Sequence, residues 1–142
     1  MPRLLLEVKT KKPVGIEPRG FLINRQVTDD MHKALPQYFP KYYGRRAGKG
    51  IAIKAIIPKT EIGKERATHN VEEMRETALI PPDKFYFSPE INIYDDKVMI
   101  ASLREKLGII IQSAEIADAM KIIHDLAWAE AKRLEKDSEN SL

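Results

Sequence analysis

The alternation of apolar and polar residues along the 142-residue chain predicts several short strands and one long helix. The clearest pattern is a pair of alternating runs, Glu90–Tyr94 and Lys97–Ala101, joined by Asp95 and Asp96. Alternation with a period of two places successive side chains on opposite faces of a sheet, and the two acidic residues suit a tight turn. The pattern therefore predicts a β-hairpin over residues 90–101.

Uninterrupted apolar runs predict further strands. The longest run, Ile51–Ile57, is rich in β-branched residues and ends at Pro58, which is typical of a central strand covered on both faces. Shorter candidates are Arg3–Val8, Phe21–Asn24, Ala78–Ile80 and Leu107–Gln112. Together with the hairpin, these runs predict a mixed sheet.

A first helix is predicted between the strands at residues 21–24 and 51–57. Thr28 is its N-cap candidate, and Pro36 and Pro40 inside it should kink it or split it into two pieces. Gly44–Gly50 is typical of a helix end followed by a turn. The charged residues 59–76 predict a solvent-facing helix or a long loop.

A second, longer helix follows the last predicted strand. Ser113 is its N-cap candidate, and the helix is expected to run to about Glu135. Apolar residues recur along it at steps of three and four, which predicts the stripe that packs against the sheet. The stripe consists of Ile116, Met120, Ile123, Ala127, Ala131 and Leu134. Trp128 lies off this stripe, near His124. It could line a ligand pocket or a dimer contact, but a second buried face is the preferred interpretation.

The order of elements predicts a single domain, an α/β or α+β sandwich in which a mixed β-sheet is flanked by helices, with α/β as the preferred class. Residues 1–20 are expected to form an N-terminal strand and a basic loop. Residues 21–135 form the domain proper, and residues 136–142 are expected to be a frayed, polar tail.

Composition excludes several classes of chemistry. The chain has no cysteine, which rules out disulfides, thiolate metal sites and cysteine nucleophiles. No apolar run approaches the ~18 residues that a membrane-spanning helix needs. The leucines near the N-terminus are followed at once by Glu7, so no secretory signal is predicted, and a cytoplasmic protein without membrane contact is expected.

Positive charge is concentrated in the first part of the chain. Residues 1–55 hold twelve Lys or Arg against four Asp or Glu, whereas residues 56–142 hold twelve against seventeen. Arg45, Arg46 and Lys49 are therefore candidates for contact with nucleic acid, with Tyr42 and Tyr43 as possible stacking groups. The alternative is that these tyrosines pack the helix while the arginines solvate its end.

No metal or cofactor site is predicted. The three histidines, His32, His69 and His124, fall in separate elements, and none is spaced four residues from another. Gly44–Gly50 contains glycines and cations but lacks the spacing and the hydroxyl of a phosphate-binding loop.

Three passages of the chain together resemble the effector domain of TrmB-type transcriptional regulators, a sugar-sensing family. They are Tyr38–Arg46 leading into Gly50–Pro58, then Ile93–Val98, and then Gly108–Ala117 with Trp128 closing the last helix. The resemblance extends from about Phe21 to Lys132. It implies a phospholipase D-like fold, a homodimer, and a small-molecule effector such as a sugar or polyol.

The same resemblance implies that DNA is bound only through a separate winged helix-turn-helix. Such regulators carry that segment ahead of the effector domain, and here only some 20 residues precede Phe21. We therefore expect the chain to represent the effector portion without its winged helix.

The enzymes of the phospholipase D fold use a His-x-Lys-x-x-x-x-Asp motif. If Asp95 is the aspartate of that motif, Glu90 occupies the lysine position and Ser88 the histidine position, and Ser102 follows in the place of the enzymes' Gly-Ser. A serine without an adjacent base is not an activated nucleophile, and a glutamate repels the phosphate that a lysine attracts. We therefore expect a domain that is not an enzyme, with a ligand cleft at Ser88, Glu90 and Ser102. A nucleic-acid-binding domain is the alternative, and a phosphodiesterase is the less favoured one.

Overall fold

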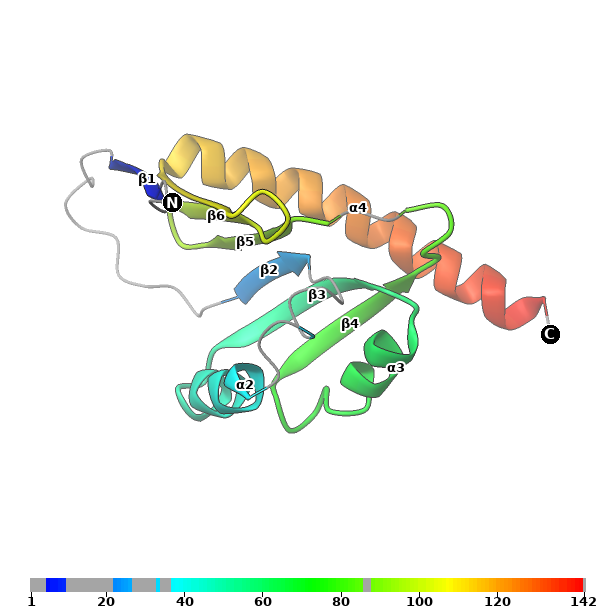
Figure 1. Cartoon of the computed structure of the whole chain (residues 1–142). Coiled ribbons are helices and arrows are strands. Elements are labelled where there is room, and N and C mark those ends of the chain that lie inside the picture. The colour runs from blue at the N-terminus through cyan, green and yellow to red at the C-terminus, as the bar shows by residue number, and fades with distance from the viewer. Residues whose placement is uncertain (1–4, 10–21, 27–32, 34–36, 86–87, 142) are drawn as a thin grey trace.

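The computed structural model describes residues 5–9, 22–26, 33, 37–85 and 88–141. Its elements are β1 Leu5–Lys9, β2 Leu22–Gln26, α2 Tyr38–Gly48, β3 Ala52–Pro58, α3 Glu61–Ala67, β4 Arg75–Ile80, β5 Glu90–Tyr94, β6 Lys97–Ser102, β7 Leu107–Gln112 and α4 Ala114–Asn140. Along the chain, α2 and α3 lie between the strands β2, β3 and β4, and α4 follows four consecutive strands (Figure 1). The predicted loop at residues 9–20 and the predicted helix start at Thr28 lie largely outside the described residues.

The strands form one seven-stranded mixed sheet in the order β1-β7-β6-β5-β2-β3-β4. The β2, β3 and β4 strands are parallel neighbours, and β1 is parallel to β7. The β5–β6–β7 meander is antiparallel and joins the parallel part through the antiparallel pairing of β5 with β2. The mixed sheet predicted from the sequence is therefore confirmed.

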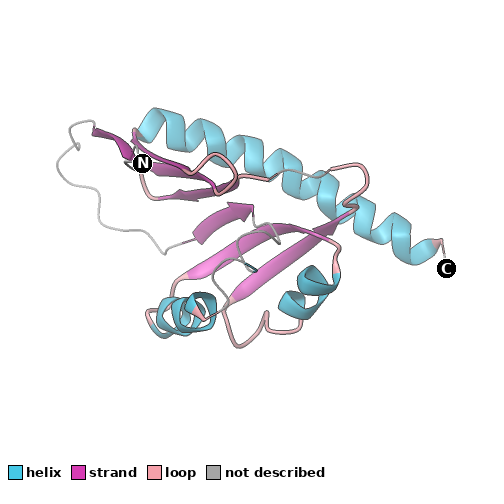
Figure 2. Ribbon diagram, viewed as in Figure 1, coloured by secondary structure: helices cyan, strands magenta, loops and turns pink. Residues whose placement is uncertain are grey.

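The helices cover both sides of this sheet. Figure 2 shows α4 along one side and the shorter α2 and α3 on the other. The parallel strands β2, β3 and β4 are linked by crossovers through α2 and α3, and right-handed crossovers that advance in one direction place both helices on one face. Gly63 allows α3 to approach β3 closely, because a Cβ at this position would lie 2.0 Å from the Pro58 carbonyl oxygen.

Alternate residues of β3 and β4 build two apolar layers. Toward α4, Ile56 packs with Ala78, Ile80 and Ala131, and Trp128 lies against them. On the opposite face, the layer consists of Ala55, Ile57 and Leu79. Burial on both faces confirms the central strand predicted at residues 51–57.

The first part of α2 shows how a helix accommodates proline. Pro40 is the third residue of α2, where its missing N–H costs no intrahelical hydrogen bond. The helix ends at Gly48, and Gly50 then adopts a positive φ of 70°. The helix end and turn predicted within Gly44–Gly50 are thus confirmed.

Helix α4 differs from its predicted form in two ways. Its buried residues are Ala117, His124 and Ala131, whereas Ile116 and Ile123 of the predicted stripe are 43% and 56% exposed. The packed face is therefore rotated toward His124 and Trp128. The helix also continues to Asn140, past the end expected at about Glu135.

The predicted N-cap of α4 is confirmed, because the Ser113 Oγ accepts a hydrogen bond from the Ile116 N–H at 3.3 Å. Within the described ranges, no helix combines the length and the apolar character needed to cross a bilayer.

Candidate functional site

The side of β5 that faces away from α4 carries polar residues in succession. Its Glu90, Asn92 and Tyr94 are the register partners of Ala101, Met99 and Lys97 on β6. The residues between them, Ile91 and Ile93, pack with Ala117 and Met120 of α4. Because side chains alternate along a strand, one short strand presents an apolar face to the helix and a polar face to the other side. We call Glu90, Asn92 and Tyr94, together with Ser88 in the segment just before the strand, the polar face of β5.

Two members of the polar face are buried although they are hydrophilic. Glu90 is 2% exposed and Asn92 is 7% exposed. The Asn92 Nδ2 donates a hydrogen bond of 2.9 Å to the Glu90 Oε1. Among the described residues, the buried Asn92 Oδ1 and Ser88 Oγ find no hydrogen-bond partner. Buried polar atoms in folded proteins are normally paired, so these two acceptors indicate a site that a ligand or water completes.

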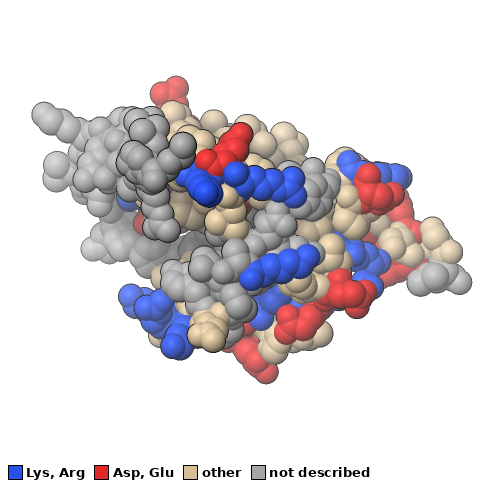
Figure 3. Space-filling view, in the orientation of Figure 1, with Lys and Arg blue, Asp and Glu red and all other residues tan. Residues whose placement is uncertain are grey.

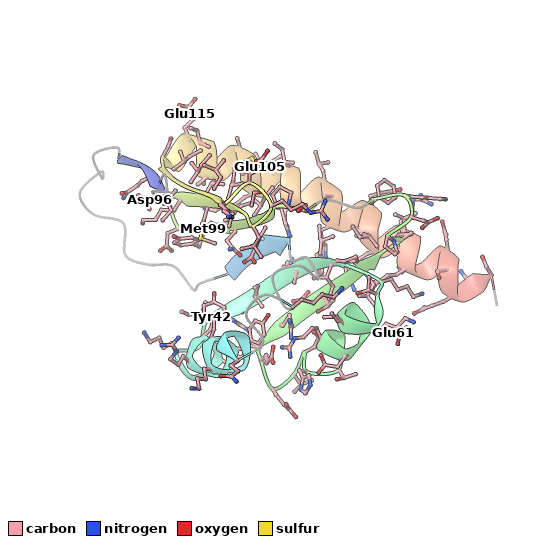
Figure 4. The ribbon with its side chains drawn as sticks, in the orientation of Figure 1. Tyr42, Glu61, Asp96, Met99, Glu105 and Glu115 are labelled. Carbon is pink, nitrogen blue, oxygen red and sulfur yellow. The ribbon has the colours of Figure 1, made fainter. Side chains whose placement is uncertain are left out.

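Aromatic rings adjoin the polar face. Burial raises the pKa of Tyr94, and the Tyr42 side chain of α2 interacts with it electrostatically. The Lys97 Nζ lies 5.9 Å from the centre of the Tyr94 ring. Figure 4 labels Tyr42 on α2 and Met99 on β6, and both lie on the side of the sheet away from α4. The neighbourhood thus combines a carboxylate, an amide, a hydroxyl and tyrosine rings.

The hairpin turn next to this face is held by Asp96. Its carboxylate accepts hydrogen bonds from the Lys97 Nζ at 2.8 Å and from the Gln112 Nε2 at 2.9 Å. These bonds lower the pKa of Asp96 to about 2. By contrast, Asp95 is exposed and has a φ of 48°, as expected of a residue that only forms the turn.

The predicted ligand residues divide between the two faces of the sheet. Ser88 lies two residues before Glu90, ahead of β5, and a bend at Pro89 separates it from the strand. Ser102 follows Ala101, the register partner of Glu90, and therefore lies on the α4 face. Its Oγ accepts a hydrogen bond from the Glu105 N–H at 3.3 Å and closes the turn to β7. Ser102 is thus not assembled with Ser88 and Glu90.

Sequence reasoning did not name Asn92 or Tyr94 as site residues, and it considered Tyr42 only as a stacking group for nucleic acid. The alternation that identified the hairpin places Asn92 on the same face as Glu90, so the signal for Asn92 was present. No comparable signal exists for Tyr42, because its approach to Tyr94 depends on how α2 packs on the sheet.

Arg46, one of the predicted nucleic-acid contacts, is buried in an arginine cluster. It is 4% exposed and donates hydrogen bonds to the backbone oxygens of Ile51 and Glu73. The Glu73 carboxylate forms ion pairs with Arg66 and Arg75. We call Arg46, Arg66, Arg75 and Glu73 the arginine cluster.

The predicted stacking residue Tyr43 belongs to the same packing. It is 2% exposed, and the guanidinium carbons of Arg66 and Arg75 lie 4.3 and 5.2 Å from its ring centre. The structure therefore overturns the nucleic-acid roles expected for Arg46 and Tyr43, because neither is accessible to a phosphate backbone or a base.

The other two predicted cations are accessible. Arg45 and Lys49 are exposed at the end of α2, and Lys41 is exposed on the same helix. Figure 3 shows basic side chains gathered over α2, whereas basic and acidic side chains interleave around α3 and the C-terminal half of α4.

The described histidines lie away from the polar face of β5. His69 is in the turn after α3, with its Nε2 3.0 Å from the Glu65 Oε1 and its Nδ1 3.3 Å from the Glu72 Oε2. His124 is buried on α4, across the sheet from Glu90. His32 lies outside the described residues. In the described part of the chain, no three His, Asp or Glu residues are grouped so that they could hold a metal ion.

Comparison with protein-family models and with curated protein sequences finds no match. Among solved structures, the chain is similar to TrmBL2, an archaeal chromatin protein whose structure is described as showing a novel mode of DNA binding. The TM-score is 0.52 at 15% sequence identity, over 77% of this chain and 43% of TrmBL2. The chain thus shares a fold with part of a TrmB-like protein and spans less than half of its length.

Proposed function

We propose that this chain is a non-catalytic ligand-binding domain of a TrmB-like transcriptional regulator, and that it binds a sugar or polyol at the polar face of β5. The observation that carries the proposal is the buried Glu90–Asn92 pair, with the Asn92 Oδ1 and Ser88 Oγ left without partners among the described residues. The fold shared with TrmBL2 supports the class of protein. A phospholipase D-like fold is part of the proposal.

Hydroxyl-rich ligands suit this group of side chains. A hydroxyl can donate to the Asn92 Oδ1 or the Ser88 Oγ and can accept from the Ser88 hydroxyl. Tyr42 and Tyr94 offer aromatic faces for the apolar side of a sugar ring. A phosphate is disfavoured, since Glu90 places a carboxyl group where phosphate-binding enzymes place a cation.

The absence of catalysis is part of the proposal and has its own test. Neither His69 nor His124 lies beside Ser88, so the serine has no described imidazole to activate it. We expect no turnover of bis-p-nitrophenyl phosphate above the rate of buffer. Turnover that disappears in Glu90→Ala would establish the phosphodiesterase alternative instead.

A regulator responds to a ligand only if the ligand binds one arrangement of the protein more tightly than another. We propose that the arrangement sensed is that of a homodimer, with DNA bound by a separate winged-helix domain. An exposed apolar patch on α4 supports this: Ile122, Ile123 and Leu126 are 63%, 56% and 70% exposed. Analytical ultracentrifugation should find a dimer that Leu126→Glu dissociates, and a wild-type monomer at all concentrations would contradict it.

The ligand is tested by calorimetric titration with glucose, sucrose, sorbitol and a set of nucleotides. We expect heat with at least one sugar or polyol, and a loss of about tenfold in affinity in Asn92→Ala, since a hydrogen-bond acceptor is removed from a buried site. Ser102→Ala is the matched control, because Ser102 lies on the other face of the sheet. Heat with nucleotides alone, or an equal loss in both variants, would contradict the proposed site.

Nucleic-acid binding is the second candidate, favoured by the exposed cations on α2. It predicts DNA binding whose affinity falls steeply with salt. The variant Arg45→Ala/Lys49→Ala should then weaken binding and reduce the salt slope, while Arg133→Ala on α4 should change neither. Binding that is unchanged in the double variant would exclude this surface.

A further inference from the structure

Strand β4 lies at one end of the strand order, so one of its sides has no neighbour among the described strands. On its other side, Ile53 and Lys59 donate their N–H groups to the carbonyl oxygens of Met74 and Ile80, at 3.0 and 2.8 Å. Backbone groups of alternate residues point to opposite sides of a strand, so residues 75, 77 and 79 face the open edge. An open edge of this kind is a template on which another chain can add a strand.

Two side chains of α4 occupy this edge. The Lys132 Nζ donates a hydrogen bond to the Thr77 carbonyl oxygen at 2.7 Å, and the Leu79 N–H donates to the Glu135 Oε1 at 2.7 Å. A residue of a neighbouring parallel strand would bond the same two backbone groups, one as donor and one as acceptor. Lys132 and Glu135 therefore take the place of one strand residue, and we call them the edge pair. Figure 1 shows β4 running toward the C-terminal half of α4.

Further contacts fix the edge pair in this position. The Lys132 Nζ also donates to the Glu135 Oε2 at 2.9 Å, and it lies 5.2 Å from the centre of the Trp128 ring. Trp128 itself packs against the apolar layer of β3 and β4. One turn farther along α4, the Ser138 Oγ accepts a hydrogen bond from the Lys59 Nζ at 3.1 Å. The packing of α4 on the sheet thus places both side chains at the edge of β4.

We propose that the edge pair keeps β4 from pairing with the β4 strand of a second copy of this chain. Once the pair is removed, the freed groups of Thr77 and Leu79 are in position to bond another strand. Two β4 edges are complementary in antiparallel orientation, because each outward residue supplies both an N–H and a C=O group. Pairing like with like closes a dimer, whereas pairing β4 with β1, the other end of the sheet, leaves open edges and continues to grow. This pairing does not depend on a ligand at the polar face of β5.

The test compares two pairs of side chains on the same helix. Lys132→Ala/Glu135→Ala removes the edge pair. Glu130→Ala/Arg133→Ala removes an ion pair of the same spacing, whose side chains are 51% and 57% exposed and whose hydrogen bonds among the described residues stay within α4. Both variants are made in Leu126→Glu, which removes the dimer contact proposed above at the exposed patch of α4.

Sedimentation and hydrogen exchange at the Leu79 amide measure the outcome. Without the edge pair, this amide should exchange about tenfold faster in dilute solution, because it loses a hydrogen bond to a charged acceptor. As the protein concentration rises, the variant should form dimers and the Leu79 amide should become protected again. The Glu130→Ala/Arg133→Ala variant should stay monomeric, with Leu79 exchange unchanged.

Three results would overturn the proposal. The first is a variant without the edge pair that stays monomeric at every soluble concentration, and the second is equal association of the two double variants. The third is growth beyond the dimer, which would indicate pairing with β1. A dimer that persists in Leu126→Glu alone would contradict only the dimer contact proposed above, and the concentration dependence of Leu79 exchange would then decide the role of the edge pair.

A single substitution keeps the test decisive if the double variant fails to fold. Glu135→Gln retains a side-chain oxygen that can accept from the Leu79 N–H, whereas Glu135→Ala removes it. We expect faster Leu79 exchange and dimer formation in Glu135→Ala only. The same behaviour of both variants would overturn the proposal.

Discussion

The two faces of the sheet are stabilised in different ways. Toward α4, Ile91 and Ile93 pack on Ala117 and Met120, and this face is stabilised by the burial and close packing of apolar side chains. On the other face, Glu90 and Asn92 are hydrogen-bonded to each other, and farther along the sheet Glu73 pairs with buried arginines. The stability of the apolar face depends on how completely side chains fill its volume. The stability of the polar face depends on whether each buried polar group keeps its hydrogen-bond or ion-pair partner.

The difference also separates two kinds of surface chemistry. The polar face of β5 offers hydrogen-bond acceptors, whereas the side chains of β5 that face α4, Ile91 and Ile93, are apolar. A strand of five residues can support both because its side chains alternate.

The largest effect is expected where a charge on the polar side loses its partner. In Glu73→Ala, Arg66 and Arg75 lose the carboxylate with which they form ion pairs. Breaking a buried ion pair from one side strongly destabilises a protein, and we expect the free energy of unfolding to fall by about 4 kcal/mol. Urea unfolding measures this change in the free energy of unfolding. Glu72→Ala, at the exposed neighbouring glutamate, is the control and should change it by less than about 0.5 kcal/mol.

Truncation on the apolar side should cost somewhat less. Ile93 is 3% exposed, and Ile93→Ala leaves a cavity under α4. We expect a loss of about 3 kcal/mol in the free energy of unfolding, again measured in urea. Ile122→Ala removes the same atoms from a side chain that is 63% exposed and should be close to neutral. Equal losses in the two variants would mean that α4 is not packed as described.

Substitutions of the two neighbouring turn aspartates, Asp95 and Asp96, should change the stability of the protein by different amounts. Asp96→Asn removes the charge that holds Lys97, and we expect a loss of about 1 kcal/mol, modest because the pair is partly exposed. The stabilisation is present above the unfolded pKa of 3.8 and is lost as the pH falls toward about 2. Asp95→Asn should be neutral, since asparagine tolerates a positive φ well. Thermal unfolding at pH 6 and pH 3 compares the two variants.

The smallest effects are expected from pH, and the two described histidines should act in opposite directions. Burial lowers the pKa of His124 in the folded state, so the unfolded chain binds the proton first as the pH falls below 6.5, and stability decreases. His124→Phe should remove this part of the decrease.

Hydrogen bonds with Glu72 and Glu65 raise the pKa of His69. Its contribution to stability is present below pH 6.5 and is lost as the pH rises through the raised pKa, so His69→Phe should slightly weaken the protein only in acid. Unfolding curves from pH 8 to pH 5 measure both histidines. A wild-type decrease that survives His124→Phe would contradict the burial of a neutral imidazole.

The sequence predicts local elements of this fold well. The hairpin at Glu90–Ala101, the strand at Leu107–Gln112 and the cap at Ser113 are confirmed, because period-two alternation and capping depend on neighbours in the sequence. The TrmB-type resemblance agrees with the structural likeness to TrmBL2 at the level of the fold.

The sequence does not predict how the elements meet. Hydrophobicity favoured Ile116, Ile123 and Ala131 as packed residues of α4, but of these three only Ala131 is buried. The small Ala117 is buried as well, and the flat Trp128 lies against the core. Arg46 is buried because the carbonyl oxygen of Glu73, 27 residues away, accepts its hydrogen bond. The candidate site was found only in part for the same reason: Glu90 carries a sequence signal, but Ser102 falls on the wrong face once the register is fixed.

One NMR titration tests the separation of the two faces most directly. The labelled chain is titrated with the sugar or polyol that gives heat, while the Asn92 side-chain amide and the His124 ring nitrogens are followed in the same spectra. We predict that the Asn92 amide shifts in a saturable way and that the His124 nitrogens stay unchanged. Shifts at His124 with none at Asn92, or no saturable shift at Asn92 with any sugar or polyol, would contradict ligand binding at the polar face of β5.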